Sequence, residues 1–441
     1  MWCRWASAPG LCQTRPVGTS SPARTRHHVE LGLRARLALR AAAAASWASR
    51  TAGRGNGSMI GGLVALRIAP DMLTQLGRGR RTAIVTGTNG KSTTTRMTAA
   101  ALATLGEVAT QADGANMDAG IVAALQARIG APIAALEVDE LHVPHVADAV
   151  EPEVLVLLNL SRDQLDRVGE INMIERKLRA CVDAHPDATI VANCDDVLVA
   201  SAAYDAKNVV WVAAGGGWAS DAASCPRDGE PILWDGETWR CEAGDLVRPQ
   251  PDWWLDDDTL YGPDGFTAPL KLALPGKANR GNAAQAVAAA AAMGADPHGA
   301  VAAASTVQEV AGRYSTVEVG PHSVHMLLAK NPAGWQEALA MIDPDADGLV
   351  IAVNGQVPDG EDLSWLWDVR FEHFENTKVV AAGERGTDLA VRLTYAGVDH
   401  TLEADPLKAI ASCPPGRVEV LANYTAFRDL NTAIAREVRN A

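Results

Sequence analysis

The sequence predicts an α/β protein with a larger unit around a parallel sheet and a smaller, Rossmann-like unit at the C-terminus. Apolar runs of about four to eight residues alternate with helical segments, which is typical of a doubly wound parallel sheet. One early run leads through a Gly-Lys-Ser turn into a helix. The chain has 441 residues, of which 48% are apolar and 21% charged. At roughly 100–200 residues per domain, this length allows two or three domains.

The first part of the chain is expected to lie outside this fold. Residues 1–30 are rich in Arg, Ser, Pro and Gly and carry no acidic residue before Glu30. This composition is typical of a disordered or non-native extension, and the alternatives are a targeting segment or a basic arm that touches anionic lipid. Residues 31–50 are rich in Ala and Leu and predict a helix within residues 31–58, ending in a Gly-rich stretch.

Four apolar runs predict the strands of the central unit, which we place at residues 59–312. They are RTAIVTG (81–87), IAALEVDE (133–140), VLVLLNL (154–160) and TIVAN (189–193). Residues 215–265 interrupt the pattern with Gly, Asp, Pro and Trp, so we interpret them as an insertion. Ala-rich helical sequence returns at 277–311.

The second α/β block gives the C-terminal unit, which we place at residues 313–441. Its strand candidates are VHMLLA (324–329), GLVIAVN (348–354), KVVAAG (378–383) and VEVLANY (418–424).

A phosphate-binding loop directly follows the first apolar run of the central unit. Glycines let backbone N–H groups close around phosphate oxygens, and the following helix N-terminus favours negative charge. Lys91 supplies a cation for the outer phosphates, and the Ser92 hydroxyl is placed to ligate Mg²⁺. The loop consists of Gly87, Thr88, Asn89, Gly90, Lys91, Ser92 and Thr93.

Carboxylates follow two neighbouring strand candidates, where a phosphate loop needs a metal ligand. Glu137, Asp139 and Glu140 end one run, and Asp163 and Asp166 follow the next. Ligands of parallel sheets gather beyond the carboxyl ends of the strands. As a set, these acids favour a magnesium site.

Charge and cysteine content narrow the class of function. The formal net charge of −14 disfavours general nucleic-acid binding, which depends on basic groups. Seven scattered cysteines do not form a secreted disulfide framework and indicate a reducing compartment. The sequence has no run of about 18 apolar residues, so we expect no transmembrane helix.

Several motifs resemble the signatures of the Mur ligase superfamily. GTNGKST resembles its ATP loop, and NLSRDQLDRVGEI resembles its second signature. VANCDD, LPGKANRGNAAQAVAAA and AGRYSTVEVG resemble three further superfamily elements. From about residue 31 to the end the chain is similar to the MurT branch, most specifically in LLAKNPAGWQEAL, DGEDLSWLWDVRFE, GTDLAVRLTYAGV and VLANYTAFRDL.

The MurT resemblance implies an ATP-dependent carbon–nitrogen ligase of peptidoglycan synthesis. Such a ligase amidates the α-carboxylate of D-isoglutamate in the lipid II stem peptide through an acyl phosphate, with ATP and Mg²⁺. Ammonia comes from a GatD-like class I glutamine amidotransferase subunit, and no Cys-His-Glu glutaminase motif is visible in this sequence. The resemblance also implies a cytoplasmic heterodimer and leaves open peripheral contact with the inner face of the membrane.

The resemblance assigns roles to individual residues. The phosphate loop, with Lys91 as a catalytic cation, binds ATP, and Ser92 and Glu137 bind Mg²⁺. Asn279 and Asn282 lie near the adenine, while Arg313 senses the γ-phosphate or anchors a hinge.

The same resemblance places an acid at the glutaminase interface. Asp362 is the first candidate, and Asp359 and Asp368 are the alternatives. A second possibility is that these acids only cap turns.

Two departures from the family pattern concern a metal and a lysine. Relatives carry a Cys₄ zinc ribbon, but here Asp228 and Gly244 replace two cysteines beside Cys225 and Cys241, so zinc is not expected. Lys177 lies one residue from the position of a carbamylated lysine, and we interpret it as a surface lysine.

Two alternative functions are weighed against amidation. The first is an amino-acid ligase similar to folylpolyglutamate synthase, and the second is a nucleotide-binding scaffold without turnover. DGEDLSWLWD and YTAF argue against the first, and the intact Lys91, Ser92 and Glu137 argue against the second.

Overall fold

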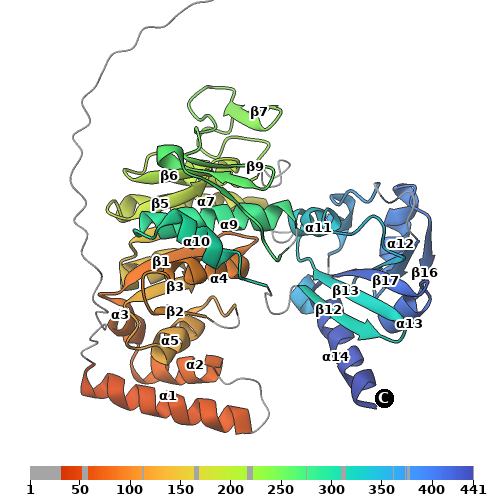
Figure 1. The fold of residues 1–441 in the computed structure, drawn as a ribbon, viewed down its shortest axis with the longest axis horizontal. Helices are drawn as coiled ribbons and strands as arrows, with labels where there is room; N and C mark the ends of the chain where they lie inside the picture. The colour runs from red at the N-terminus through yellow and green to blue at the C-terminus, as the bar shows by residue number, and fades with distance from the viewer. Residues whose placement is uncertain are drawn as a thin grey trace, which may run out of the picture.

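The computed structural model describes residues 31–51, 58–111, 114–162, 168–215, 222–274, 276–308, 314–360, 362–372, 374 and 378–440. These residues form two large sheets that lie side by side, each with its own helices, and a separate two-stranded sheet (Figure 1). The predicted extension at residues 1–30 lies outside the described residues, and so does the expected unit boundary at 312–313. The predicted α/β fold class is confirmed.

Within the described residues, the first sheet has nine strands in the order β11-β10-β9-β6-β5-β4-β1-β3-β2. Neighbouring strands from β2 to β9 run parallel, whereas β9, β10 and β11 pair antiparallel. In sheet order the strands are β11 (Thr267–Pro269), β10 (Thr259–Tyr261), β9 (Trp253–Asp256), β6 (Val209–Ala213), β5 (Thr189–Asn193), β4 (Val154–Leu157), β1 (Arg81–Thr86), β3 (Ile133–Glu137) and β2 (Val108–Thr110).

Helices cover both faces of the first sheet, so its central strands are buried on both sides. Along β1, Ile84 packs into one core and Ala83 and Val85 pack into the other. This two-sided burial explains why these strands are continuous apolar runs rather than alternating ones. The face of Ile84 carries α5 (Asp118–Ala127), α6 (Val143–Val150), α7 (Val168–Ala184) and α8 (Val197–Ala203). The opposite face carries α4 (Lys91–Leu102), α9 (Lys277–Ala292) and α10 (Pro297–Ala304).

The stretch predicted as an inserted module or a long excursion, residues 215–265, has two parts that lie in different places. Its first part forms the hairpin β7 (Ile232–Asp235) and β8 (Thr238–Cys241), which stands outside the large sheet (Figure 1). Its second part returns to the sheet, because Trp253 of β9 pairs with Val212 of β6. The buried Trp253 ring also packs into the main core, so the chain rejoins the sheet well before residue 265.

Within the described residues, the second sheet has six strands in the order β12-β13-β17-β14-β15-β16. Only the β12–β13 pair is antiparallel. In sheet order they are β12 (Tyr314–Val319), β13 (His322–Leu328), β17 (Gly416–Ala422), β14 (Gly348–Ala352), β15 (Val379–Ala382) and β16 (His400–Leu402). One face carries α11 (Pro332–Leu339) and α12 (Gly386–Tyr395), and the other carries α13 (Pro406–Ala411) and α14 (Tyr424–Asn440).

In the described part of the chain before β1 lie the helices α1 (Leu33–Thr51), α2 (Ser58–Ile68) and α3 (Met72–Gly77). Small residues join the first two, since a Cβ on Gly61 would lie 2.1 Å from the Ser46 Oγ. The described helices include none whose length and apolar character suit a bilayer crossing.

Candidate active site

The phosphate loop joins β1 to α4 and has little free space around its glycines. Gly90 has a φ of 82°, in the left-handed region that favours glycine. A Cβ at Gly90 would lie 2.6 Å from Asn282 Oδ1, and one at Gly87 would lie 2.9 Å from the Asn159 carbonyl oxygen. Both glycines are therefore needed for the loop to pack against its neighbours.

Lys91 is the first residue of α4, and its side chain is buried. Its Nζ donates to the Gly87 carbonyl oxygen at 2.5 Å and lies 3.3 Å from Glu140 Oε2. A cation is thus held at the loop with a carboxylate as its counter-ion. The sequence placed Glu140 in an acidic set after β3 but did not pair it with Lys91.

Ser92 and Glu137 meet at the end of β3, as the sequence predicted for a magnesium site. The Ser92 hydroxyl donates to Glu137 Oε1 at 3.1 Å. Glu137 is buried, and its backbone N–H and C=O both bond the side chain of Gln111, at 3.1 and 2.7 Å. Hydroxyl and carboxylate oxygens are hard ligands that suit Mg²⁺, so the residues present fit this ion.

A cavity of about 580 Å³ extends from the phosphate loop to the C-terminal unit. Its walls come from both the central unit and the C-terminal unit. The central unit contributes Lys91, Ser92 and Glu137, and the C-terminal unit contributes Lys330, Glu337 and Tyr424.

The structure brings the two predicted asparagines of α9 to the same cavity. Asn279 and Asn282 both line it, and the Asn282 amide lies 3.5 Å from Asn279 Oδ1. Lys177 is exposed on α7. Arg313, like Asp163 and Asp166, lies outside the described residues.

An amide pair that the sequence analysis missed connects the phosphate loop to the C-terminal unit. Asn89 donates through Nδ2 to Asn331 Oδ1 at 3.2 Å, and Asn331 donates through Nδ2 to Asn89 Oδ1 at 3.3 Å. Asn331 is buried and also caps α11, because its Oδ1 accepts from the Gly334 N–H at 2.8 Å. The AKNPAG motif contained this residue, but nothing in it pointed to Asn89.

The three candidate acids of the C-terminal unit differ in their partners. Asp359 accepts from the backbone N–H of Thr425 at 3.0 Å and also from its hydroxyl. Asp368 lies 3.8 Å from Arg162 of the central unit. Asp362 is exposed and accepts from the Ser364 N–H at 2.8 Å, and this backbone hydrogen bond lowers the pKa of Asp362. Asp362 therefore does cap a turn, and its carboxylate also faces solvent.

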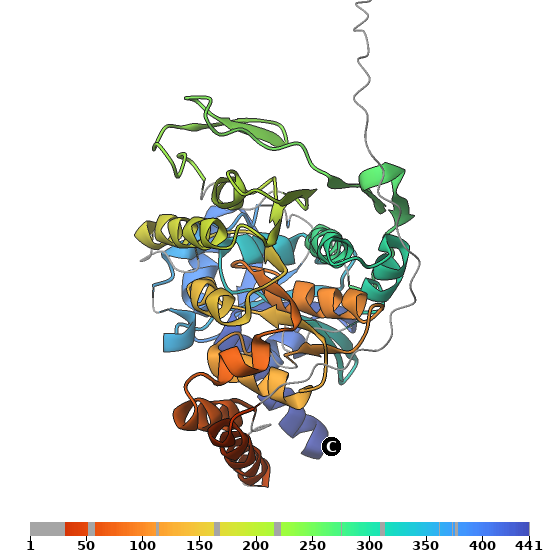
Figure 2. The ribbon, with the colours of Figure 1, turned by 90° about the vertical axis from the view of Figure 1, so that its left-hand side faces the viewer.

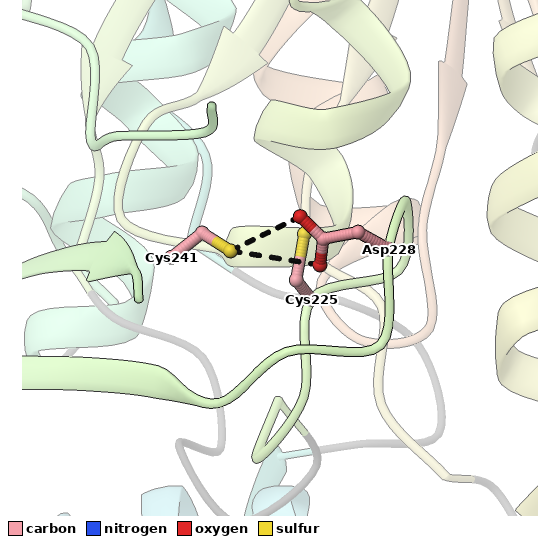
Figure 3. A group of neighbouring side chains, drawn as sticks. All are labelled: Cys225, Asp228 and Cys241. Carbon is pink, nitrogen blue, oxygen red and sulfur yellow. Dashed lines mark hydrogen bonds between the residues drawn. The ribbon is translucent and has the colours of Figure 1, made fainter. Parts of the chain in front are cut away.

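The residues at the zinc-ribbon position form a small cluster (Figure 3). Ligand atoms of Cys225, Asp228 and Cys241 lie within 4.8 Å of one another. The Cys241 thiol donates to Asp228 Oδ2 at 3.3 Å, and burial raises the pKa of Cys225 to about 11. A structural zinc site needs four ligands, with its cysteines as thiolates, and position 244 is a glycine with open space around it. These residues do not fit such a site.

Comparisons with known proteins agree with this architecture. Residues 85–290 match the sequence model of the Mur ligase middle domain, and residues 328–427 match that of the MurT ligase C-terminal region. The fold is similar to a pseudomurein peptide ligase type C from Methanothermus fervidus, with a TM-score of 0.63, 19% identity and coverage of 81% of this chain and 79% of that one. It is also similar to MurF from Acinetobacter baumannii, with a TM-score of 0.62, 18% identity and coverage of 85% and 80%.

Two curated relatives match over most of both chains. The MurT subunit of lipid II isoglutaminyl synthase (glutamine-hydrolyzing) from Streptococcus pneumoniae is 29% identical over 419 residues, covering 86% of this chain and 93% of its own length. Its Staphylococcus aureus counterpart is 27% identical over 413 residues, with the same coverage. The fold and the phosphate-loop site define a ligase of the Mur type. Within that class, the chain belongs to the MurT family.

Proposed function

We propose that this chain amidates the α-carboxylate of D-isoglutamate in the stem peptide of lipid II, using ATP, Mg²⁺ and ammonia from a GatD-like glutaminase subunit. The observation that carries this proposal is the cavity whose walls combine the phosphate loop with the MurT-type C-terminal unit. The curated relatives are named as subunits of a glutamine-hydrolysing lipid II isoglutaminyl synthase, which supports the substrate and the divided organisation.

The reaction needs an activated carboxylate, because ammonia does not displace oxide from a carboxylate at a useful rate. A carboxylate oxygen attacks the γ-phosphorus, ADP leaves, and an acyl phosphate forms. Ammonia then adds to the acyl carbon, phosphate leaves with the C–O bond electrons, and a proton is lost. Bound magnesium would neutralise phosphate charge during the first step.

In this proposal the residues of the chain hold and orient the reactants. Lys91 stabilises charge on the outer phosphates, which requires its Nζ to leave the Gly87 carbonyl and turn towards the ligand. Ser92 and Glu137 hold the magnesium ion, and Glu140 keeps Lys91 positioned. Asn279 and Asn282 lie near the adenine. The two walls of the cavity exclude water from the acyl phosphate.

A second part of the proposal concerns the glutaminase subunit. We assign Asp362 as a carboxylate offered to a histidine of that subunit, where it would orient the imidazole as the acid of a nucleophile–base–acid triad does. Its solvent-facing carboxylate supports this role, since Asp359 and Asp368 are engaged with Thr425 and Arg162.

Product formation tests the function directly. We expect ADP release and amidated lipid II only when glutamine, the glutaminase subunit and lipid II are all present. ADP release that instead requires free glutamate and a folate would favour the folylpolyglutamate synthase-like alternative. ATP binding without turnover under every condition would favour the scaffold.

The role of Asp362 has its own test, the Asp362→Asn variant. We expect it to reduce glutamine hydrolysis by the complex about 100-fold or more, since it removes the acid of the triad. Amidation with added ammonium salt should stay at the wild-type rate. Asp368→Asn is the matched control and should leave glutamine hydrolysis unchanged. A wild-type hydrolysis rate in Asp362→Asn would contradict the assignment.

A further inference from the structure

We propose that the outward faces of α1 and α2 dock this protein onto an anionic lipid bilayer. This surface, the α1–α2 face, is made of apolar and arginine side chains. It consists of Leu33, Leu37, Trp47, Met59, Ile60 and Leu63 together with Arg36, Arg40 and Arg67.

The helix α1 exposes three of its four large apolar side chains, while Leu39 is half-buried against the core, and its fully buried residues are small. Leu33, Leu37 and Trp47 are 77%, 55% and 64% exposed. The face that packs on the protein carries only Ala and Ser among its buried residues, namely Ala35, Ala38, Ala42 and Ser49. A surface helix of a globular protein normally has the opposite arrangement. The exposed side of α1 is therefore built for contact with something apolar.

The spacing of these side chains places them on one stripe. Leu33, Leu37, Arg40 and Trp47 follow one another at intervals of four, three and seven residues, which returns to the same side of a helix. The exposed side of α2 continues the pattern with Met59, Ile60, Leu63 and Arg67. Figures 1 and 2 show α1 at the outer edge of the molecule, with α2 between it and the rest of the central unit.

The charge of this region identifies the chemistry of the partner. Residues 31–70 contain six arginines and no acidic residue, in a chain whose net charge is −14. A second copy docking face to face would bring like charges together, because a two-fold interface pairs the same patch on both subunits. The segment before it is also basic up to Glu30. Apolar side chains interleaved with arginine instead match the acyl boundary and the anionic headgroups of a bilayer.

Docking of this kind would bring the protein to its proposed substrate, because lipid II is held in a membrane. The use of the surface in the cell therefore rests on the proposed function. A helix lying in the interfacial plane would keep the cavity near the headgroups that carry the stem peptide. The docking itself requires neither nucleotide nor substrate, so it can be tested alone.

Vesicle flotation with the full chain tests the surface without nucleotide or lipid II. Vesicles of phosphatidylcholine with about 30% phosphatidylglycerol are compared with pure phosphatidylcholine, at low and high salt. We expect binding to the anionic vesicles that weakens at high salt. Leu37→Glu combined with Trp47→Glu should reduce that binding about 10-fold or more. Val391→Glu combined with Tyr395→Glu, which changes two exposed positions of α12 by the same charge, should not.

Tryptophan fluorescence reports on this site locally. The emission of Trp47, obtained as the difference between the wild-type and Trp47→Phe spectra, should shift to shorter wavelength on anionic vesicles. The proposal would be overturned if the Leu37→Glu/Trp47→Glu variant, with an unchanged melting temperature, bound anionic vesicles as strongly as the wild type does. A wild-type dimer in solution that this variant converts to a monomer would also overturn it, and would assign the face to a second copy. Amidation of detergent-solubilised lipid II is measured on the same variant and should be unchanged. If vesicle binding is as expected but no variant or wild type amidates lipid II, the proposed function fails and the docking surface stands.

Discussion

Lys91 combines two requirements that rarely coincide, because it is a charged side chain that is buried and still has to reach a ligand. Burial of an unpaired charge is costly, and here Glu140 and two loop carbonyls compensate for it. The ammonium group can exchange these carbonyl contacts for phosphate oxygens when a ligand binds. The loop is thus both stable without a ligand and suited to bind one.

Replacing this lysine should therefore separate stability from activity. We expect Lys91→Ala to lower kcat for amidation by about 100-fold or more, because it removes the cation that the phosphate loop itself places beside the outer phosphates. The variant should stay folded, since Glu140 lines the cavity and can be hydrated there once Lys91 is removed. Amidation kinetics and thermal unfolding on the same sample check both statements. Near wild-type amidation would show that the phosphate site lies elsewhere.

Asn331 offers a second residue-level test, of how the two units cooperate. We expect Asn331→Ser to lower kcat for amidation about 10-fold while changing ATP affinity little, because serine can still cap α11 but cannot reach Asn89. Asn331→Ala should show the same kinetic loss and also lower the free energy of unfolding by about 1 kcal/mol through loss of the cap. A wild-type kcat in Asn331→Ser would leave this asparagine a helix cap only.

These residues show which parts of the site could be predicted from the sequence. The loop from Gly87 to Thr93 is a continuous motif, and Glu137 ends a recognisable strand, so local pattern was enough. The partners of the loop come from distant segments: Glu140 pairs with Lys91, and Asn331 pairs with Asn89 across the two units. Such pairs depend on how sheets and helices pack, which no local pattern contains.

At the scale of elements, the four strand candidates of each unit were found as strands, because helices bury them on both faces and leave continuous apolar runs in the sequence. The strands that follow β6 were harder to predict from the sequence, since they are short and carry exposed residues and turn-forming Gly and Asp. Composition alone therefore marked residues 253–265 as part of an insertion, whereas Trp253 and Leu260 pack into the main core. The hairpin β7–β8 does leave the sheet, and it carries the cluster of Cys225, Asp228 and Cys241.

Hydrogen bonds from thiols should hold this hairpin in place of a metal. Folding raises the pKa of Cys225 from 9.0 to about 11, mainly through burial, so the folded state retains the thiol proton more strongly. That contribution to stability is present below pH 9 and is lost as the pH rises towards 11. We expect elemental analysis of the purified chain to find less than one zinc per molecule.

A variant that restores the two missing cysteines tests whether their absence prevents zinc binding. Asp228→Cys combined with Gly244→Cys should bind about one zinc per chain, because it restores four thiolates in two knuckles. Removal of that zinc with a chelator should lower its melting temperature and leave that of the wild type unchanged. Stoichiometric zinc in the wild-type chain, lost on Cys225→Ser, would refute the thiol account.

At the scale of the whole molecule, function depends on two units that share one cavity. The central unit brings the phosphate loop and the proposed magnesium ligands, and the C-terminal unit brings Lys330, Glu337 and Tyr424 to the opposite wall. The α1–α2 face lies at an outer edge of the central unit (Figure 1). In our proposals, one chain thereby offers separate surfaces for a membrane, for nucleotide and for a glutaminase subunit.

The central claim is that the substrate carboxylate is activated by phosphoryl transfer in this shared cavity. Its most direct test uses lipid II labelled with ¹⁸O in the α-carboxylate of D-isoglutamate, with the complete enzyme, ATP and glutamine. We expect one labelled oxygen to appear in inorganic phosphate for each amide formed, because the acyl phosphate breaks at its C–O bond. With Lys91→Ala, labelled phosphate should form at a rate lower by about 100-fold or more, in step with amidation. Amide formation with unlabelled phosphate would contradict the account.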